Sequence, residues 1–186
     1  PFVMGKATEA FSRAAHVTRV SLEAHRVLGN PMEPKAALAS YDAAKDVYDL
    51  YVPTQGVSMM RAGVAAVTQV PPEKIRIRAQ DVGGGFGIRG DAYTEFCALL
   101  LASRKLGRPV KWVASRSETS LSDYHGRGAT LSGQLALDRE GNFLGVKISW
   151  LCDMGAYLSH PGPLINTLPP ALHAINLYRI PAVHGL

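Results

Sequence analysis

The chain has 186 residues, 47% of them hydrophobic and 19% charged, a balance typical of a folded globular protein and not of a disordered one. It contains no run of about 18 apolar residues, which excludes a membrane-spanning helix, and its two cysteines are too few for a disulfide framework or an iron–sulfur cluster. The nine basic and four acidic residues at 73–116 account for the whole net charge of +5, which suits either an anionic ligand, nucleic acid included, or a solvated cationic surface.

The N-terminal part of the chain predicts one helix and a series of strands. A short amphipathic helix is expected at residues 5–15, and alternating apolar residues predict a strand at 20–24. After a turn-rich connection at 30–34, two further strands at 36–40 and 46–52 are separated by a short turn. This spacing is typical of an antiparallel hairpin.

The middle of the chain changes to an alternation of helices and strands. The expected elements are a helix at 57–67, a strand at 73–80, a helix at 92–106 and a strand at 109–114. Asp91 is the expected N-cap of the second helix, and Cys97 falls within its apolar run as a small core residue. Residues 46–114 therefore predict the order β-α-β-α-β, which favours a small parallel sheet with right-handed crossovers.

The C-terminal part returns to a hairpin pattern. Apolar residues alternate at 131–137 and again at 144–150, on either side of the turn DREGN. From Asp153 the chain is rich in proline and glycine, with one or two helical turns expected near 164–175. The predicted fold class is α+β, a βαβαβ stretch flanked by antiparallel hairpins.

A glycine-rich segment, DVGGGFGIRGDAYTEF at residues 81–96, contains the spacing G-x-G-x-x-G at Gly85, Gly87 and Gly90. Because it follows an expected strand and precedes an expected helix, it is a candidate dinucleotide-binding loop. Arg116 stands near the place where an acidic residue would bind the ribose, so the cofactor in that case would be NADP. No Lys-Ser or Lys-Thr follows the glycines, which excludes a P-loop.

A purely structural interpretation of the same loop stays open on the residues alone. The flanking hairpins and the glycine block at 83–85 argue against the dinucleotide interpretation, and a tight turn with positive φ explains the glycines equally well. A protein-ligated metal site is not predicted, because the six histidines are scattered, with no H-x-x-x-H and no Cys pair.

Seven short segments, taken in chain order, can be compared with known families. They are GKATEAF at 5–11, NPMEPKAALASYD at 30–42, TQG at 54–56, GGGFG at 83–87, GRPVKWVASRSE at 107–118, and GAYLS and YRIP near the C-terminus. Together they resemble the molybdenum-binding (large) subunit of the xanthine dehydrogenase and aldehyde oxidase family, which includes aerobic carbon monoxide dehydrogenase. The resemblance implies that residues 1–186 are the N-terminal part of a molybdopterin-binding domain.

The resemblance also implies cofactors and partners. The molybdenum cofactor, a molybdopterin with its cytosine dinucleotide form as one alternative, would hold the metal by its own dithiolene. 2Fe-2S clusters and FAD would lie on partner domains or subunits, and the substrate would be a small molecule, with neither nucleic acid nor a membrane involved. The catalytic base would lie beyond Leu186, so this segment alone is expected to be inactive. With no export signal visible, a cytoplasmic location is expected, the periplasm being the alternative.

The resemblance assigns the site to two loops. Gln55 is the expected catalytic residue, its amide donating to an oxygen ligand of the metal, and Gly85, Phe86 and Gly87 are the expected cofactor-binding residues. If the strands at 46–52 and 73–80 are parallel, both loops leave the same sheet edge, and Gln55 and Gly87 should lie within about 10 Å. The alternatives are that Gln55 caps its own helix and that Phe86 is a core anchor.

The segment departs from purine-oxidising members of the family at two places. Their loop continues G-K-E after GGGFG, whereas this chain has Ile88, Arg89 and Gly90, and Pro169 stands where they have a substrate-binding arginine. Xanthine is therefore not the expected substrate. An aldehyde, a non-purine N-heterocycle or a similar small molecule is expected instead.

Overall fold

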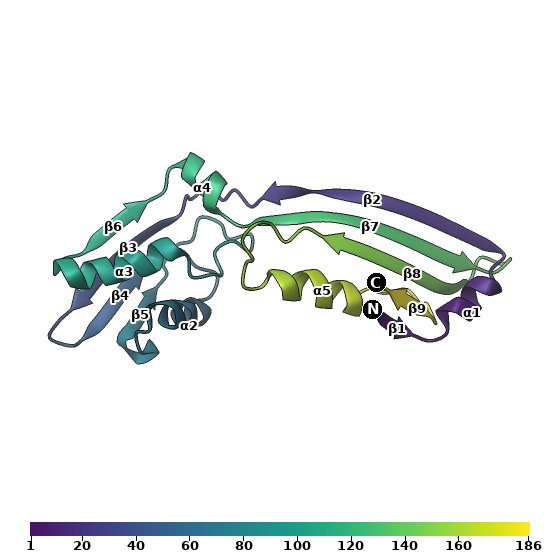
Figure 1. The fold of residues 1–186 in the computed structure, drawn as a ribbon, viewed down its shortest axis with the longest axis horizontal. Coiled ribbons are helices and arrows are strands. Elements are labelled where there is room, and N and C mark those ends of the chain that lie inside the picture. Colours follow the sequence, from purple (N-terminus) through teal and green to yellow (C-terminus); the bar gives the residue numbers. More distant parts are fainter. The chain divides into compact units, whose positions relative to one another are not determined.

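The computed structural model describes residues 1–186, except for the side chain of Pro169. The chain divides into two compact units, one formed by residues 1–27 together with 126–186 and the other by residues 28–125. Each unit has its own β-sheet (Figure 1). The candidate site lies entirely in the 28–125 unit.

The 28–125 unit contains a four-stranded sheet with the strand order β5-β4-β3-β6. Its elements are β3 (Ala36–Asp42), β4 (Val47–Tyr51), α2 (Val57–Thr68), the 3-10 turn η1 (Pro72–Lys74), β5 (Ile75–Arg78), α3 (Thr94–Leu106), β6 (Val110–Val113) and α4 (Arg116–Ser122). The helices and strands predicted for this region are confirmed, and α4 is an additional helix that was not predicted.

Strand pairing confirms the hairpin and the first βαβ crossover. β3 and β4 pair antiparallel, and β4 pairs parallel with β5, from Tyr48 opposite Ile75 to Tyr51 opposite Arg78. β6 does not lie beside β5: it pairs antiparallel with β3 at the other edge. The expected small parallel sheet is therefore corrected to a mixed sheet. Because the short 42–47 turn fixes β3 beside β4, the chain returning through α3 packs over β3 and adds β6 beyond it (Figure 1).

The core of this unit lies between the sheet and the two long helices. Leu50 of β4, Met60 and Val64 of α2 and Leu100 of α3 are fully buried in it. Cys97 is also buried there, as expected for a small core residue. Burial of each large side chain stabilises the fold by about 1.5–3 kcal/mol, so α2 and α3 are firmly held against the strands whose loops form the site.

The helix ends correct one detail and explain another. α3 begins at Thr94 with Tyr93 at the N-cap position, so the predicted N-cap, Asp91, is wrong by two residues. α3 ends at Gly107 in the left-handed conformation, with φ 63°, which suits glycine. α4 is started by a capping box, in which the Ser115 hydroxyl accepts from the Glu118 N–H and the Glu118 carboxylate accepts from the Ser115 N–H.

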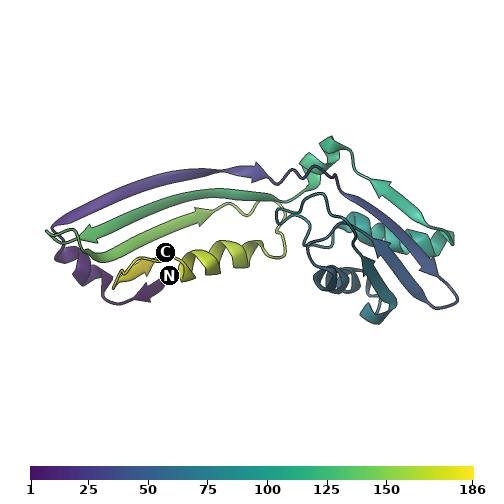
Figure 2. The same cartoon turned by 180° about the vertical axis from the view of Figure 1, so that it is seen from behind.

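The other unit contains a five-stranded sheet with the strand order β1-β9-β8-β7-β2. Its elements are β1 (Phe2–Met4), α1 (Ala7–Ser12), β2 (His16–Leu28), β7 (His125–Leu137), β8 (Phe143–Cys152), α5 (Gly162–Leu172) and β9 (Val183–Gly185). β7 and β8 form the predicted hairpin, with Gly133 opposite Ile148. α5 runs along β8 (Figure 2), where the Trp150 indole N–H donates to the Asn166 carbonyl at 2.9 Å.

Candidate functional site

Two loops meet at the carboxyl edge of the parallel strands β4 and β5. The short segment 52–56 leads from β4 into α2, and the longer segment 79–93 leads from β5 to α3. They are joined at Arg89, whose carbonyl oxygen accepts from the Gln55 N–H at 3.0 Å and from the Thr54 hydroxyl at 3.0 Å. The Thr54 hydroxyl in turn accepts from the Gly56 N–H at the start of α2.

The side chain of Gln55 completes the contact between the loops. Its Oε1 atom accepts hydrogen bonds from the backbone N–H groups of Gly87 at 2.9 Å and Arg89 at 3.1 Å. Two converging N–H donors require an oxygen at that position, so the NH₂ end of the amide faces away from them. Among the described residues Nε2 has no hydrogen-bond acceptor. The structure thus brings Gln55 and Gly87 together, as the parallel strands predicted. The alternative that Gln55 caps its own helix is wrong, because its Oε1 accepts from the glycine loop and not from an N–H group of α2.

The glycine segment holds a conformation that few other residues would adopt. Gly84 and Gly87 have positive φ, at 116° and 88°, and Phe86 between them has φ 52°. Gly85 is needed for a different reason, since a Cβ there would lie 2.6 Å from the Cγ and Cδ atoms of Gln55. At Gly87 a Cβ would meet no atom within 4 Å, so the space beside it is open.

Phe86 projects from this loop instead of anchoring it. Its side chain is 72% exposed, so the alternative of a core anchor is wrong. Its backbone N–H has no acceptor among the described residues. The loop therefore presents an exposed ring and a backbone N–H group next to the Gln55 amide.

The dinucleotide interpretation does not match this geometry. Segment 79–93 separates β5 from α3, whereas a dinucleotide fingerprint needs a tight turn that opens directly into the helix. A Cβ on Gly90 would meet only the Gly87 carbonyl, at an ordinary 3.7 Å, so the third glycine is not required for close helix packing. α3 begins only at Thr94, so Phe86 and Gly87 precede it in the chain but do not stand at its N-terminus. Gln55, in contrast, directly precedes Gly56, the N-cap of α2.

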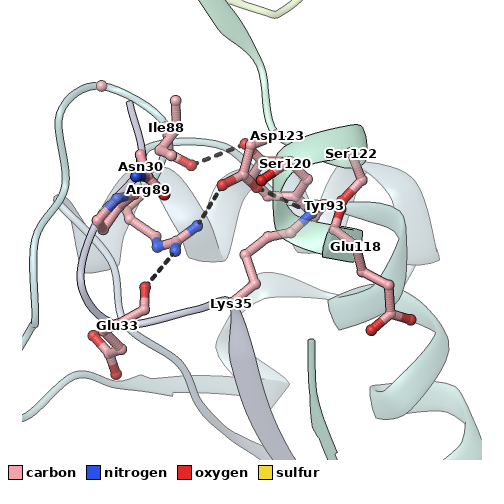
Figure 3. Close-up of polar contacts among 12 residues, drawn as sticks. Asn30, Glu33, Lys35, Ile88, Arg89, Tyr93, Glu118, Ser120, Ser122 and Asp123 are labelled. Atoms are coloured by element: carbon pink, nitrogen blue, oxygen red, sulfur yellow. Dashed lines mark hydrogen bonds and ion pairs between the residues drawn. The ribbon is translucent and has the colours of Figure 1, made fainter. Parts of the chain in front are cut away.

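A buried ionic network fastens the far side of the glycine loop (Figure 3). The Arg89 side chain is fully buried, its Nη2 donates to the Glu33 carbonyl at 2.9 Å, and its Nη1 lies 3.5 Å from Oδ2 of Asp123. Asp123, at the C-cap of α4, is also fully buried. Its other oxygen lies 3.2 Å from the ammonium of Lys35.

Lys35 is the second buried cation of this network. Its ammonium donates to the Ser122 hydroxyl at 2.8 Å and lies 3.3 Å from the Glu95 carboxylate and 4.0 Å from the centre of the Tyr93 ring. The Tyr93 hydroxyl donates to the Ile88 carbonyl at 2.9 Å. Burial, and then the nearby Asp123 carboxylate, raise the pKa of Tyr93 well above its usual range.

The segment 30–33 supports the loop from another side. The Glu33 carboxylate accepts from the Gly83 N–H at 2.7 Å, and the Gly83 carbonyl accepts from the Glu33 N–H at 3.2 Å. The guanidinium of Arg116 donates to the Asn30 side chain and to two carbonyls of the same segment, at 2.6–3.0 Å. These roles were not predicted from the sequence, although a lysine directly before the apolar strand at 36–40 and the S-x-x-E spacing at 115–118 were available signals.

Five of the nine basic residues at 73–116, including Arg116, have polar partners within the chain. Lys74 pairs with Asp46, Arg78 with Asp49, Arg89 with Asp123, and Arg104 donates to the Tyr48 hydroxyl. These contacts favour a structural explanation for the local positive charge over a site for a large polyanion. Within the described residues no group of three or more His, Cys, Asp or Glu side chains could hold a metal ion, and no helix is long and apolar enough to cross a membrane.

Comparisons with known proteins give a consistent picture. The family model described as "Molybdopterin cofactor-binding domain" matches residues 1–186. The chain is 33% identical over 178 residues to the 6-hydroxypseudooxynicotine dehydrogenase complex subunit gamma of Paenarthrobacter nicotinovorans, covering 96% of this chain and 22% of that protein. It is 34% identical over 161 residues to the carbon monoxide dehydrogenase large chain of Hydrogenophaga pseudoflava, covering 86% and 20% respectively.

A solved structure agrees with these relatives. Quinoline 2-oxidoreductase from Pseudomonas putida 86 superimposes with a TM-score of 0.90 at 32% identity, over 98% of this chain and 23% of that one. The chain therefore spans between a fifth and a quarter of the length of these proteins.

Proposed function

The chain belongs to the family of molybdopterin cofactor-binding domains, and on this premise we propose that it is part of a molybdenum hydroxylase. Such an enzyme would oxidise an aldehyde, an N-heterocycle or a similar small molecule with water as the source of oxygen. The similar proteins described above are dehydrogenases and an oxidoreductase, which supports this type of activity. The segment contributes one wall of the cofactor site.

One observation carries the proposal: the Gln55 carbonyl oxygen is bound by two backbone N–H groups of the glycine loop, and its NH₂ end has no acceptor among the described residues. A side-chain amide fixed in this way is a prepared hydrogen-bond donor. It also lies beside the N-terminus of α2, where the partial positive charge of the helix favours anionic groups.

The loop pair fits the cofactor that the family implies. The open space at Gly87 allows a bulky group to approach the backbone, and the Phe86 N–H and the Gln55 amide supply donors for the oxygen atoms of such a group. A molybdenum ion held by the sulfur atoms of a molybdopterin requires no cluster of protein ligands. Gly85, Phe86 and Gly87 would therefore line the cofactor, and Gln55 would donate to it.

When bound, the cofactor supplies the two-electron redox chemistry of the reaction. The residues of this chain would bind and orient the cofactor. Gln55 would hold an oxygen atom of the cofactor by its amide, the glycine loop would shape the approach, and the exposed ring of Phe86 would lie beside the bound group. The electrons would pass to 2Fe-2S clusters and FAD on partner domains or subunits of the complex. The cytosine dinucleotide form of the cofactor is one alternative for the bound species.

Two features support a substrate other than a purine. By the family resemblance, Gly90 and Pro169 stand where purine-oxidising members would have charged side chains. The side chain of Pro169 lies outside what the structure describes, but proline offers no charged group in any conformation. Arg89 cannot replace a lost cation, because it is buried and turned toward Asp123. Each charged hydrogen bond to a substrate would contribute about 1.5–3 kcal/mol.

The test is the Gln55→Ala variant of the full-length enzyme, assayed with a panel of aldehydes and N-heterocycles and an artificial electron acceptor. We expect a lower kcat at near-normal molybdenum content. Gln80→Ala is the matched control, because Gln80 is exposed and follows β5 at the same sheet edge. Unchanged turnover in Gln55→Ala would contradict the assigned role, and efficient xanthine oxidation would contradict the substrate class.

A further inference from the structure

Arg89 is the residue at which the candidate site joins the interior of the 28–125 unit. Its backbone N–H donates to the Gln55 side chain, and its carbonyl accepts from the Gln55 N–H and the Thr54 hydroxyl. Its side chain, in contrast, extends into the buried network, where it donates to Asp123 and to the Glu33 carbonyl. We propose that the buried Arg89–Asp123 pair is a positioning device, which fixes the Arg89 backbone and thereby the donor end of Gln55. This inference rests on the proposed function of Gln55.

The chemistry of the pair favours positioning over mere stabilisation. Both side chains are completely removed from solvent, and buried ion pairs are often no more stabilising than apolar residues of the same size. What an ion pair adds is direction, because a guanidinium donates along fixed axes. Here one nitrogen of the fork points to the Glu33 carbonyl and another to Asp123, so the loop is held relative to two other segments of the chain (Figure 3).

Asp123 is itself held in place. It is the C-cap of α4, its N–H donates to the Thr119 carbonyl at 3.0 Å, and α4 is started by the capping box at Ser115. The Asp123 carboxylate is also shared with Lys35. Lys35 therefore offers a matched comparison: it is equally buried and faces the same carboxylate, but its hydrogen bonds and ion pairs go to Ser122, Glu95 and Asp123 and not to residues 88–90.

The first experiment measures hydrogen exchange in the cofactor-free, full-length subunit. The N–H groups of Gly87 and Arg89 are protected by the Gln55 carbonyl oxygen, so peptides covering residues 84–91 report its position. We expect Asp123→Asn and Arg89→Lys to accelerate their exchange about tenfold, as Gln55→Ala does, which corresponds to the loss of about one hydrogen bond. Lys35→Met should leave this exchange unchanged even if the melting temperature falls. Equal acceleration in Lys35→Met, or none in Asp123→Asn, would overturn the inference.

The second experiment is a double-mutant cycle on turnover in the loaded enzyme. If Arg89 acts through Gln55, Arg89→Lys should lower kcat about tenfold in the normal background, with little change in KM, but should have almost no further effect in Gln55→Ala. Rate losses that multiply in the double variant would show that Arg89 acts independently, and would overturn the inference. If Gln55→Ala alone leaves turnover unchanged, the proposed function fails, while the exchange measurement still decides whether the pair positions the loop.

Discussion

Gly85 and Gln55 lie in direct contact, so that any Cβ at position 85 would come within 2.6 Å of the Cγ and Cδ atoms of the glutamine. This contact belongs to the same arrangement in which the Gln55 carbonyl oxygen accepts from two N–H groups beyond Gly85. A glycine is therefore needed at position 85 because any larger residue would clash with the side chain of Gln55. Its loss has consequences that can be separated from those of a strained turn.

Gly85→Ala should displace the Gln55 side chain from both of its donors. We expect turnover of the full-length enzyme to fall nearly as far as in Gln55→Ala, with stability lowered by about 1–2 kcal/mol for the lost hydrogen bonds. Steady-state kinetics and thermal unfolding check this result. Gly126→Ala is the control, since a Cβ there meets no atom within 4 Å. Normal kcat in Gly85→Ala would mean that the position of Gln55 does not matter for turnover.

Gly87→Ala should interfere with cofactor binding more than with folding. The positive φ of 88° costs an alanine about 1–2 kcal/mol, and the new methyl group enters the open space beside the loop. Gly107→Ala carries a similar strain at φ 63°, also with open space, but at the end of α3. We expect both variants to lose similar thermal stability and only Gly87→Ala to lose molybdenum, as measured by metal analysis. Equal metal content would contradict the approach of the cofactor to Gly87.

Ser115→Ala should weaken the start of α4 and thus the support of Asp123. Loss of an N-cap hydroxyl costs about 1 kcal/mol, which denaturant unfolding can resolve. The backbone N–H of Ser115 lowers the pKa of the Glu118 carboxyl. The stabilisation from Glu118 is therefore present at neutral pH and is lost as the pH falls through that lowered pKa. Ser117→Ala, an exposed position of the same helix, is the control, and an equal loss of stability there would refute the capping role.

Tyr93 should make the protein sensitive to alkali. Its pKa is raised by burial, so above about pH 10 the tyrosine ionises in the unfolded chain but keeps its proton in the folded one. The folded state then binds more protons, and the free energy of unfolding falls as the pH rises. We expect Tyr93→Phe to be about 1 kcal/mol less stable at neutral pH, through the lost bond to Ile88, but to show a shallower alkaline decline. Parallel stability curves would contradict the role of Tyr93.

The sequence predicted the local elements and the meeting of the two loops. Alternation and helical spacing located the hairpins and the β4-α2-β5 crossover, and parallel strands imply that Gln55 and Gly87 share an edge. The strand that pairs with β6 could not be predicted from hydrophobic periodicity. The pattern shows that a strand is buried, but it does not show which other strand lies beside it. α4 was missed because its start is marked by Ser115 and Glu118 and hardly by apolar residues.

The buried network was the least predictable part of the site. Lys35 and Asp123 belong to residue types that are almost always exposed, and their partners lie far away along the chain. Only the folded chain shows that each charge has a partner. Arg89 is the clearest case: it belongs to the basic segment 73–116, whose charge suits an anionic ligand, and the structure turns its side chain inward.

The division of the chain into units bears on the order in which it can fold during synthesis. The 28–125 unit is one continuous segment, whereas the other unit needs residues 1–27 and residues from 126 onward together. A ribosome that has released the continuous segment has supplied every residue of that core, so it can fold while β2 still lacks its neighbour β7. Before β7 is made, the thirteen residues of β2 lack the strand they pair with in the folded sheet, and strand-forming segments without a partner are prone to wrong pairing between nascent chains.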